Sequence, residues 1–551
     1  MNRVIVHQIP NDLDNDLKAI GEAIYKTEHT NLQQTHVDML MEVFKELHKQ
    51  ISEQYILSKS KDNWLGRRDF YALIRHYMHK QLPDSSLEGV MRNLGGCRDP
   101  QFQKCLAEAL QKVSRKSTKE ILPLMSNWGS LECVKMNLQD EDCRHCMLVC
   151  EKPYSWQLLL DHNLLSCEDT IFLFESKFAS DTAIMTSYDH LHKVINCMQV
   201  AKKVVLYKLK SIHECLYDML NQRYLGDSPE NRFCRVAVED QTRDCIVAQG
   251  FKCIVIVFEE DMKNSTEKAF FGRFERQYIS YTELLSPSDR EIVHSFEKRL
   301  YEHYCLFNKR DLYQLFCGFN NDTIPSAIAY ILLQRKLQRQ SNRDDDNDDK
   351  KDQKQDETEQ LMQQLLELFH PLRHPAKIVW LAMESSSRNF DRANQSFDTF
   401  EQVLDTAKKN SNKEMLLILT CDLEYNSFQR KWSSKRISDY MKVNQLEKDV
   451  TDFFESSKKS RLILQYQHKS KDLTQFFQIK CILESAYSLY CNKPDHEKPT
   501  NQKFVVLIVH NVMGQQDPFP IIFSQFKQIP FFFLQNNKKK GINILLWKSF
   551  E

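Results

Sequence analysis

The sequence predicts an α/β protein with mostly parallel sheets, divided into several folding units. Short apolar runs alternate with amphipathic helical patterns between residues 121 and 338, which is typical of a parallel sheet covered by helices. The same alternation resumes after residue 359. The length of 551 residues exceeds what one hydrophobic core accommodates, so we expect roughly three or four units.

Residues 1–120 are expected to form helices only, as in a lid-type subdomain or a helical bundle. Apolar residues recur there at helical spacing, without an apolar run that would indicate a strand. Ser85-Ser86-Leu87-Glu88 predicts a capping box, and Gly95-Gly96 predicts the end of the helix that follows. The other expected helices cover residues 17–24, 39–47 and 64–77.

Residues 121–338 are expected to form one parallel sheet with its helices. The clearest strand is Cys253–Phe258, a continuous apolar run that predicts burial on both faces. Ser286-Pro287 predicts the start of a helix, because serine caps and proline fits the first turn. Strands are expected at 147–150, 171–174, 203–207 and 253–258, and helices at 156–165, 212–220, 287–300 and 312–337.

Residues 339–358 have almost no apolar side chain and predict an acidic, disordered linker. A helical pattern from Leu361 to Phe369 follows. The apolar runs beyond it indicate that residues 359–551 start a further α/β module. Its expected strands lie at 415–420, 461–465, 504–509, 531–534 and 542–547.

Composition excludes several classes of function. The 75 basic and 75 acidic side chains balance, which gives no global attraction for nucleic acid or anionic membranes. No apolar run approaches the roughly 18 residues of a membrane helix, and no signal peptide is recognised. The 17 cysteines are scattered and odd in number, as in a reducing compartment. Cys143-x-x-Cys146 could bind zinc with Cys133, His145 and Cys150, but no second such pair follows and a buried strand explains these cysteines better, so we expect no metal.

Glycine is scarce, with 12 in 551 residues against about 7% in an average protein. None of these glycines stands in G-x-x-x-x-G-K-[ST] or in G-x-G-x-x-G. A phosphate cradle needs glycine because the backbone N–H groups must approach the phosphate oxygens closely. We therefore expect no nucleotide cradle within the chain.

The order of several segments resembles mysterin, the family of giant AAA+ ubiquitin ligases with a RING finger. The end of that family's fourth AAA+ module is matched by MNRVIVHQIPNDLDNDL, WLGRRDFYALIRHY and VMRNLGG. The fifth, degenerate module is matched by NCMQVAKKVVLYKLKSIHECLYDMLNQRYLG, CIVIVFEEDM and FFGRFERQYI, with LFCGFNNDTIPSAI in its small subdomain. The start of the sixth is resembled more loosely by segments from LILTCDLEYNSF to FVVLIVHNV.

This resemblance implies AAA+ (P-loop NTPase-like) modules with parallel sheet cores and helical small subdomains, in a dynein-like arrangement. Residues 1–120 would end one module with its small subdomain, and residues 121–338 would form a degenerate module with its own. Residues 339–358 would be the linker, and 359–551 the truncated start of a further degenerate module. On this interpretation the chain is a fragment, with a phosphate loop upstream and the RING downstream.

The resemblance also implies three arginines as nucleotide sensors or arginine fingers. Arg3 stands in the Met-Asn-Arg segment and Arg68 in Gly-x-Arg-Asp. Arg273 matches the finger of the fifth module, although Gly272 replaces the family's asparagine there. A guanidinium at a module boundary stabilises phosphate charge from outside the pocket. From the residues alone, a surface arginine after a buried strand is the simpler interpretation of Arg273.

No catalytic residue is expected within the chain. By resemblance, Tyr207 and Lys208 occupy the place of the acidic pair that holds Mg²⁺ in an active module. Glu151-Lys152-Pro153-Tyr154 stands where the phosphate loop would be, without its glycines. The fifth module is therefore expected not to hydrolyse ATP.

The family resemblance implies a cytoplasmic parent, with an association with lipid droplets in the family, that hydrolyses ATP with Mg²⁺ and transfers ubiquitin from a ubiquitin-conjugating enzyme. The chain alone is expected to bind no cofactor and to be inactive. Its partners would be the remaining AAA+ modules and the RING part, to which it would transmit motion as a ring section that senses nucleotide. The alternative is a catalytically inert structural or interaction protein of AAA+ shape. Charge balance and cysteine spacing disfavour a metal or nucleic-acid module.

Overall fold

The computed structural model describes residues 13–27, 34–54, 64–80, 87–114, 117–226, 228, 231–238, 241–264, 268–304, 319–341, 353–369, 378–381, 396–397, 415–420, 434–468, 472–494, 496, 498, 503–511 and 531–534. The chain forms two compact units. The first comprises Met1–Leu159, Leu164–Glu175 and Ala183–Leu284, and the second comprises Leu160–Asn163, Ser176–Thr182 and Leu285–Glu551.

The first unit opens with helices, as the spacing of apolar residues predicts. Phe44 and Phe70 lie fully buried in the core that these helices share, with ring centroids 5.3 Å apart. The helices are α1 (Leu13–Thr27), α2 (Gln34–Gln54), α3 (Arg67–Lys80), α4 (Glu88–Asn93), α5 (Pro100–Ser114), α6 (Thr118–Ser126) and α7 (Ser130–Gln139).

The two serines of the capping box predicted before α4, Ser85 and Ser86, lie outside the described residues. The helix begins at Glu88, with Leu87 as its N-cap, so Glu88 stands at the first helical position and not the third. The Glu88 carboxylate instead accepts a hydrogen bond from Arg92, one turn along the same helix (3.0 Å). The predicted end is correct, because α4 stops at Asn93 just before Gly95-Gly96.

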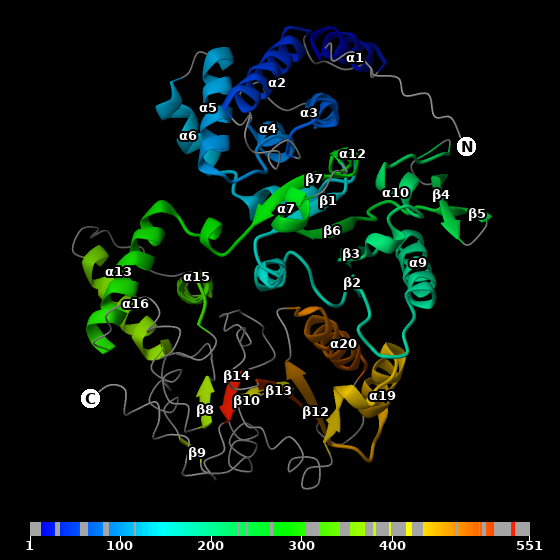
Figure 1. The fold of residues 1–551 in the computed structure, drawn as a ribbon, viewed down its shortest axis with the longest axis vertical. Helices are drawn as coiled ribbons and strands as arrows, with labels where there is room; N and C mark the ends of the chain where they lie inside the picture. The colour runs from blue at the N-terminus through cyan, green and yellow to red at the C-terminus, as the bar shows by residue number, and fades with distance from the viewer. Residues whose placement is uncertain are drawn as a thin grey trace. The chain divides into compact units, whose positions relative to one another are not determined.

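A five-stranded sheet forms the centre of the first unit, and all its strand pairs are parallel (Figure 1). All four predicted strands are present, and every residue of Cys253–Phe258 is buried, as predicted. Glu275–Ile279 was not predicted, because its sequence ERQYI begins with three polar residues and contains no apolar run. The strands are β1 (Cys146–Cys150), β2 (Thr170–Phe174), β3 (Lys203–Tyr207), β6 (Cys253–Phe258) and β7 (Glu275–Ile279), in the order β2-β3-β6-β1-β7.

The order in which the chain adds strands to the sheet reverses at β1, which has β6 on one side and β7 on the other. From β1 the chain runs to the far edge at β2, returns through β3 and β6, and then crosses β1 to reach β7. In open parallel sheets, the carboxyl ends of the strands beside such a reversal are where ligands usually bind. A ligand of this unit would therefore be expected at the segment after Cys150 and at the carboxyl ends of β3 and β6.

Two predicted helices are shorter than their apolar patterns indicate. Residues 155–157 form a 3₁₀ turn and α8 (Leu158–Asp161) one further turn, after which Asn163 adopts a left-handed backbone (φ 55°) that ends the helix. Residues 212–220 contain only α10 (Tyr217–Leu220) as α-helix. The Cys215 carbonyl accepts a hydrogen bond from Ala237 N of a neighbouring strand (3.1 Å).

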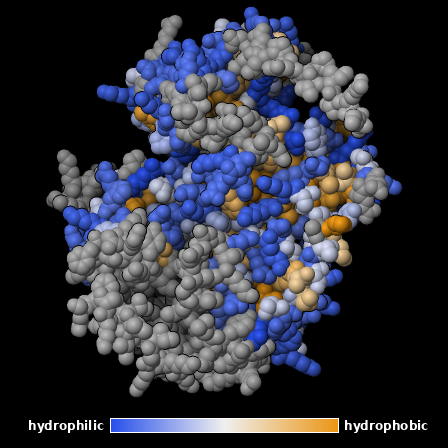
Figure 2. All heavy atoms as spheres, in the orientation of Figure 1, coloured by the Kyte–Doolittle hydropathy of each residue, from blue (hydrophilic) through white to orange (hydrophobic). Residues whose placement is uncertain are grey.

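That neighbouring strand belongs to a hairpin that the sequence did not predict. It pairs β4 (Phe233–Val238) with β5 (Gln241–Ile246) in antiparallel register. A long helix, α9 (Ala183–Gln199), was also not predicted. Figure 2 shows apolar atoms at the surface over α9, where Ile184 and Met185 are 70% and 56% exposed. The short helices α11 (Glu259–Asn264) and α12 (Lys268–Phe271) connect β6 to β7.

The second unit contains helices followed by a mixed seven-stranded sheet. The serine cap is confirmed, because Ser286 Oγ accepts a hydrogen bond from Asp289 N (3.2 Å) at the start of α13. The helices are α13 (Pro287–Tyr304), α15 (Thr323–Ser341), α16 (Gln353–Phe369), α19 (Val443–Glu455) and α20 (Thr474–Cys491). The strands, in sheet order, are β11 (Lys435–Arg436), β12 (Arg461–His468), β13 (Phe504–Asn511), β10 (Met415–Thr420), β14 (Phe531–Leu534), β8 (Ile378–Leu381) and β9 (Ser396–Phe397).

The four predicted strands of this unit that fall on described residues are confirmed as β10, β12, β13 and β14. Residues 342–352 of the predicted linker lie outside the described residues. The prediction was wrong at both ends of the range 339–358, because α15 continues to Ser341 and α16 already begins at Gln353. Glutamine, lysine and glutamate favour helix, which explains this extension of charged sequence into α16. The strand predicted at 542–547 lies outside the described residues. Among the described helices, none combines the length and apolarity needed to cross a membrane.

Candidate functional site

Four aromatic side chains lie at the ends of β2, β3 and β6 and just after β1. We call Trp156, Phe174, Tyr207 and Phe258 the aromatic plug. Tyr207 is fully buried at its centre, with ring centroids 6.1 Å from Trp156, 5.2 Å from Phe174 and 5.7 Å from Phe258. Trp156 is only 2% exposed. The plug therefore lies at the edge of the sheet where α/β proteins of this topology usually bind ligands.

The backbone after β1 is fixed by hydrogen bonds within the protein. Tyr207 donates its hydroxyl to the Pro153 carbonyl (3.3 Å), which links the end of β3 to the segment after β1. Glu151 N donates to Ile279 O on β7 (3.2 Å). Lys208 has a left-handed backbone (φ 56°), and its ammonium lies 4.5 Å from the centre of the Phe258 ring.

A second feature of the first unit is a cavity of about 470 Å³ lined by five arginines, which we call the arginine pocket. It is lined from α3, from the loop before β1, from the turn after α10 and from the loop before β7. Two of the arginines predicted as nucleotide sensors, Arg68 and Arg273, meet here. The ionisable side chains of its lining from Arg, His, Asp and Glu are Arg68, Arg75, His76, Asp140, Asp142, Arg144, Arg223, Arg273 and Glu275.

Arg68 extends from the first turn of α3 toward the sheet. Its Nη1 donates to Asn221 Oδ1 (3.1 Å) and to Ala269 O (3.4 Å). A Cβ on Gly272 would lie 3.4 Å from Arg68 Cδ, which is tighter than most such contacts. Gly272 therefore leaves room for Arg68 beside the loop that carries Arg273.

Arg273 and Arg223 both lie against Tyr217, the first residue of α10. The guanidinium carbon of Arg273 is 4.5 Å from the centre of the Tyr217 ring, and that of Arg223 is 5.3 Å away. Arg273 also lies 5.6 Å from the Phe270 ring. Both distances to Tyr217 are within the range of cation–π attraction.

Arg144 joins the walls of the pocket, and sequence reasoning missed it. Its Nη1 donates to Asp69 Oδ1 (2.8 Å) on α3 and to Gly272 O (2.9 Å), next to Arg273. Its Nη2 donates to Asn93 Oδ1 (2.8 Å). A single guanidinium thus holds α3, α4 and the Gly272 loop together, and no sequence motif marks this role.

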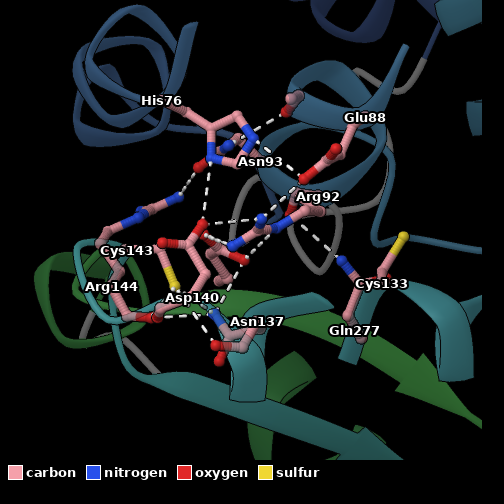
Figure 3. A network of polar contacts seen from close by, with 12 residues as sticks. His76, Glu88, Arg92, Asn93, Cys133, Asn137, Asp140, Cys143, Arg144 and Gln277 are labelled. Atoms are coloured by element: carbon pink, nitrogen blue, oxygen red, sulfur yellow. Dashed lines mark hydrogen bonds and ion pairs between the residues drawn. The ribbon is translucent and has the colours of Figure 1, made fainter. Parts of the chain in front are cut away.

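A buried polar network centred on Arg92 adjoins the pocket and shares Asp140 and Glu275 with its lining (Figure 3). The fully buried Arg92 guanidinium donates two hydrogen bonds to Glu275 (3.0 and 3.1 Å). Its Nη1 also donates to Glu88 (3.0 Å) and to Asp140 (2.9 Å). Asn137 donates to Glu275 Oε2 (2.8 Å). Two helices and β7 are joined by these contacts.

Burial and charge act in opposite directions on Glu275. Burial alone would raise the pKa of this carboxyl, but the adjacent Arg92 charge and hydrogen bonds outweigh burial and hold the pKa below its ordinary value. Burial likewise opposes the charge of Arg92, yet the nearby Glu275 carboxylate raises its pKa overall. The lining as a whole carries five arginines against three acids, Asp140, Asp142 and Glu275. This excess of positive charge makes the pocket favour an anion.

Comparison with known proteins relates this geometry to a family. The family model described as the RNF213 AAA domain matches residues 135–285, which contain all five strands of the parallel sheet. The chain is related to the RNF213 family. Mouse and human proteins named E3 ubiquitin-protein ligase RNF213 are 23% identical to it over 289 and 296 residues. A zebrafish protein named E3 ubiquitin-protein ligase rnf213-beta is 22% identical over 302 residues.

RNF213 is also called mysterin, so the predicted resemblance is confirmed, as is the AAA+ fold class. Each of these matches covers 50% of the chain and 6% of the relative, so the chain spans about 6% of the length of the curated relatives it matches. The model's range includes the aromatic plug and Arg273, whereas Arg68 precedes it. The match therefore leaves the roles of both arginines as predictions.

The remaining predicted site residues have different outcomes. Arg3 lies outside the described residues. Cys146 and Cys150 lie on β1, and both are buried. The Cys143 thiol is 3.1 Å from the ammonium of Lys252, a cation that disfavours a metal ion at this point. Among the described residues, no group of three His, Cys, Asp or Glu side chains is arranged to hold a metal ion.

Proposed function

We propose that this chain is a non-hydrolysing section of an RNF213-type AAA+ ATPase, and that its arginine pocket senses a nucleotide held by another module of the parent. The observation that carries this proposal is the aromatic plug. Phosphates bound at the end of β1 would have to displace Trp156 and Tyr207, both almost fully buried. Removing a buried tryptophan from its packing costs about 3–5 kcal/mol, a large part of the binding energy of a nucleotide.

The chemistry of the segment supports the same proposal. Nucleotide phosphates are bound by backbone N–H groups of a glycine-rich loop, and Mg²⁺ is bound by carboxylates. Glu151-Lys152-Pro153-Tyr154 contains no glycine, and Tyr207-Lys208 offers no carboxylate. The Tyr207 hydroxyl is also committed to Pro153 O. ATP and Mg²⁺ therefore do not fit this module, and we derive no hydrolytic step within it.

The arginine pocket supports a sensing role. Arginine presents a planar set of donors that matches phosphate oxygens and stabilises their charge from a neighbouring subunit or module. Arg68 and Arg273 line one cavity, the first from α3 and the second from the loop before β7. A phosphate presented by another module and bound by both would couple nucleotide state to the position of α3. An inert protein of AAA+ shape has no need for such a convergence of cations.

The wider role follows from the relatives. The mouse, human and zebrafish relatives are named as E3 ubiquitin-protein ligases. We propose that the parent hydrolyses ATP with Mg²⁺, accepts ubiquitin from a ubiquitin-conjugating enzyme through a RING part and works in the cytoplasm. This section would transmit nucleotide-dependent motion to the ligase part. Lipid-droplet association of the parent is a proposal of the same kind.

An ATPase assay and a binding assay on the 551-residue chain test this function. We expect no Mg²⁺-dependent turnover, and only weak ATP binding, with Kd of roughly 0.1–1 mM, since two guanidinium groups without a cradle supply little more. That weak binding should disappear in an Arg68→Ala/Arg273→Ala double variant. Turnover that persists in this variant and copurifies with the chain would overturn the non-hydrolysing assignment.

A further inference from the structure

Two cations of the arginine pocket are held against one exposed ring. Tyr217 is 39% exposed, and the guanidinium carbons of Arg273 and Arg223 lie 4.5 and 5.3 Å from its centre. Like charges repel, so two arginines come together only where something compensates the repulsion. The negative face of an aromatic ring provides such compensation.

The turn that carries these residues also contacts Arg68. Asn221, between Tyr217 and Arg223 in sequence, accepts a hydrogen bond from Arg68 Nη1 (3.1 Å). The turn itself is fixed, because Arg223 N donates to Asp218 O (2.9 Å) and Asn221 Nδ2 to Tyr217 O (2.7 Å). One rigid turn therefore sets the positions of three arginines of the pocket.

We propose that Tyr217 is a positioning residue that holds Arg223 and Arg273 as a paired clamp for a polyphosphate, and that Arg223 contacts the phosphate directly. This inference rests on the proposed function, since it extends the set of phosphate-binding residues beyond Arg68 and Arg273. Sequence resemblance assigns no role to either Tyr217 or Arg223. Two guanidinium groups held by one ring fit a chain of phosphates better than a single phosphate, because each group can bind its own phosphate.

Arg223 is well suited to bind a ligand. Its side chain is 62% exposed and lies 3.8 Å from Asp218, so its ion pair is exposed and weak. Arg235 provides a matched control: its side chain is 61% exposed and lies 3.8 Å from Asp244, on the hairpin outside the pocket lining. A difference in phosphate affinity between the Arg223 and Arg235 variants therefore reflects where the arginine lies, because the exposure and the charge of the two side chains are matched.

The test is isothermal titration calorimetry of the 551-residue chain with tripolyphosphate at low ionic strength, where exposed charges are least screened. We expect Arg223→Ala to weaken binding about tenfold, as for a lost charged hydrogen bond. Tyr217→Ala should weaken it roughly fivefold through lost cation–π contacts. Tyr217→Phe, which keeps the ring, and Arg235→Ala should bind like wild type.

The outcomes separate this inference from the function on which it rests. If Arg68→Ala and Arg273→Ala lose binding while Arg223→Ala and Tyr217→Ala bind like wild type, the clamp is wrong and the sensing pocket stands. If the wild-type chain does not bind tripolyphosphate, both fail. Equal losses for Tyr217→Phe and Tyr217→Ala would also overturn the role of the ring. Parallel titrations identify the source of the phosphate: tighter binding of ATP indicates a nucleotide, and equal or tighter binding of tripolyphosphate indicates free polyphosphate.

Discussion

Replacing Arg92 tests whether the buried network joins the helices of the first unit to its sheet. Arg92→Met keeps an unbranched side chain of similar reach but removes the charge that Glu275, Glu88 and Asp140 share. The side chains of these three acids are at most 8% exposed. Breaking a buried ion pair from one side costs about 3–5 kcal/mol, because the remaining charge stays buried and uncompensated. We expect a loss of stability of this size.

Amide hydrogen exchange measured by mass spectrometry reports the loss of stability segment by segment. It can therefore separate an effect in the first unit from one in the second. A loss of 3–5 kcal/mol corresponds to exchange about 100- to 4,000-fold faster, at roughly 1.4 kcal/mol per tenfold. The increase should appear in peptides that cover 88–94 and 275–279 and not in 504–511 of the second unit. Arg235→Met, at an exposed position, should change protection by less than about 0.5 kcal/mol. Unchanged exchange at 88–94 and 275–279 in Arg92→Met would refute the reasoning.

The stability that the Glu275–Arg92 pair contributes should change with pH in a predictable direction. The folded pKa of Glu275 lies below the ordinary 4.5, so its stabilisation is fully present above about pH 4.5 and is lost as pH falls through the folded pKa. Without Arg92, burial would raise the pKa of this carboxyl instead. Protection in Arg92→Met, corrected for intrinsic exchange, should therefore increase from pH 7 to pH 5, whereas wild type should stay constant. Equal profiles would contradict the assignment of Glu275 as the partner.

Three further substitutions test single contacts. Gly96→Ala would place a Cβ against the carbonyl oxygen of Arg276, so urea unfolding should show a loss of stability of several kcal/mol. Gly129→Ala, where a Cβ would have no atom within 4 Å, should be nearly neutral, and equal losses of stability in the two variants would contradict the clash at Gly96. Ser286→Ala should cost about 1 kcal/mol by removing the cap of α13, visible as faster exchange at its first turn, and no change there would count against the cap. Trp156→Ala should lower stability by about 3–5 kcal/mol without creating tight ATP binding, and micromolar binding in that variant would show that the ring alone blocks a competent site.

The sheet strands could be predicted because both of their faces are buried. Runs such as Cys253–Phe258 and Lys203–Tyr207 are apolar along most of their length, which few other structures explain. Glu275–Ile279 escaped prediction because its polar residues serve the buried network, where Glu275 binds Arg92. These two residues are 183 positions apart, and local periodicity carries no information on such a pair.

The site was predictable only in part. Resemblance singled out Arg68 and Arg273 but gave no indication that they line one pocket. Arg144 and Tyr217 could not be found from the sequence, since their roles come from contacts with distant segments. The scarcity of glycine did indicate the lack of a phosphate cradle, and four aromatic side chains lie near the place where that cradle would be.

Calorimetry with ATP, with and without Mg²⁺, tests the central claim most directly when it is performed on the Arg68→Ala/Arg273→Ala chain. This variant removes two of the pocket arginines, so tight binding could come only from a site at the aromatic plug. We expect no binding tighter than about 1 mM in either condition. Micromolar binding, about −8 kcal/mol, would contradict this expectation and would mean that the module of residues 135–285 holds a nucleotide despite the plug.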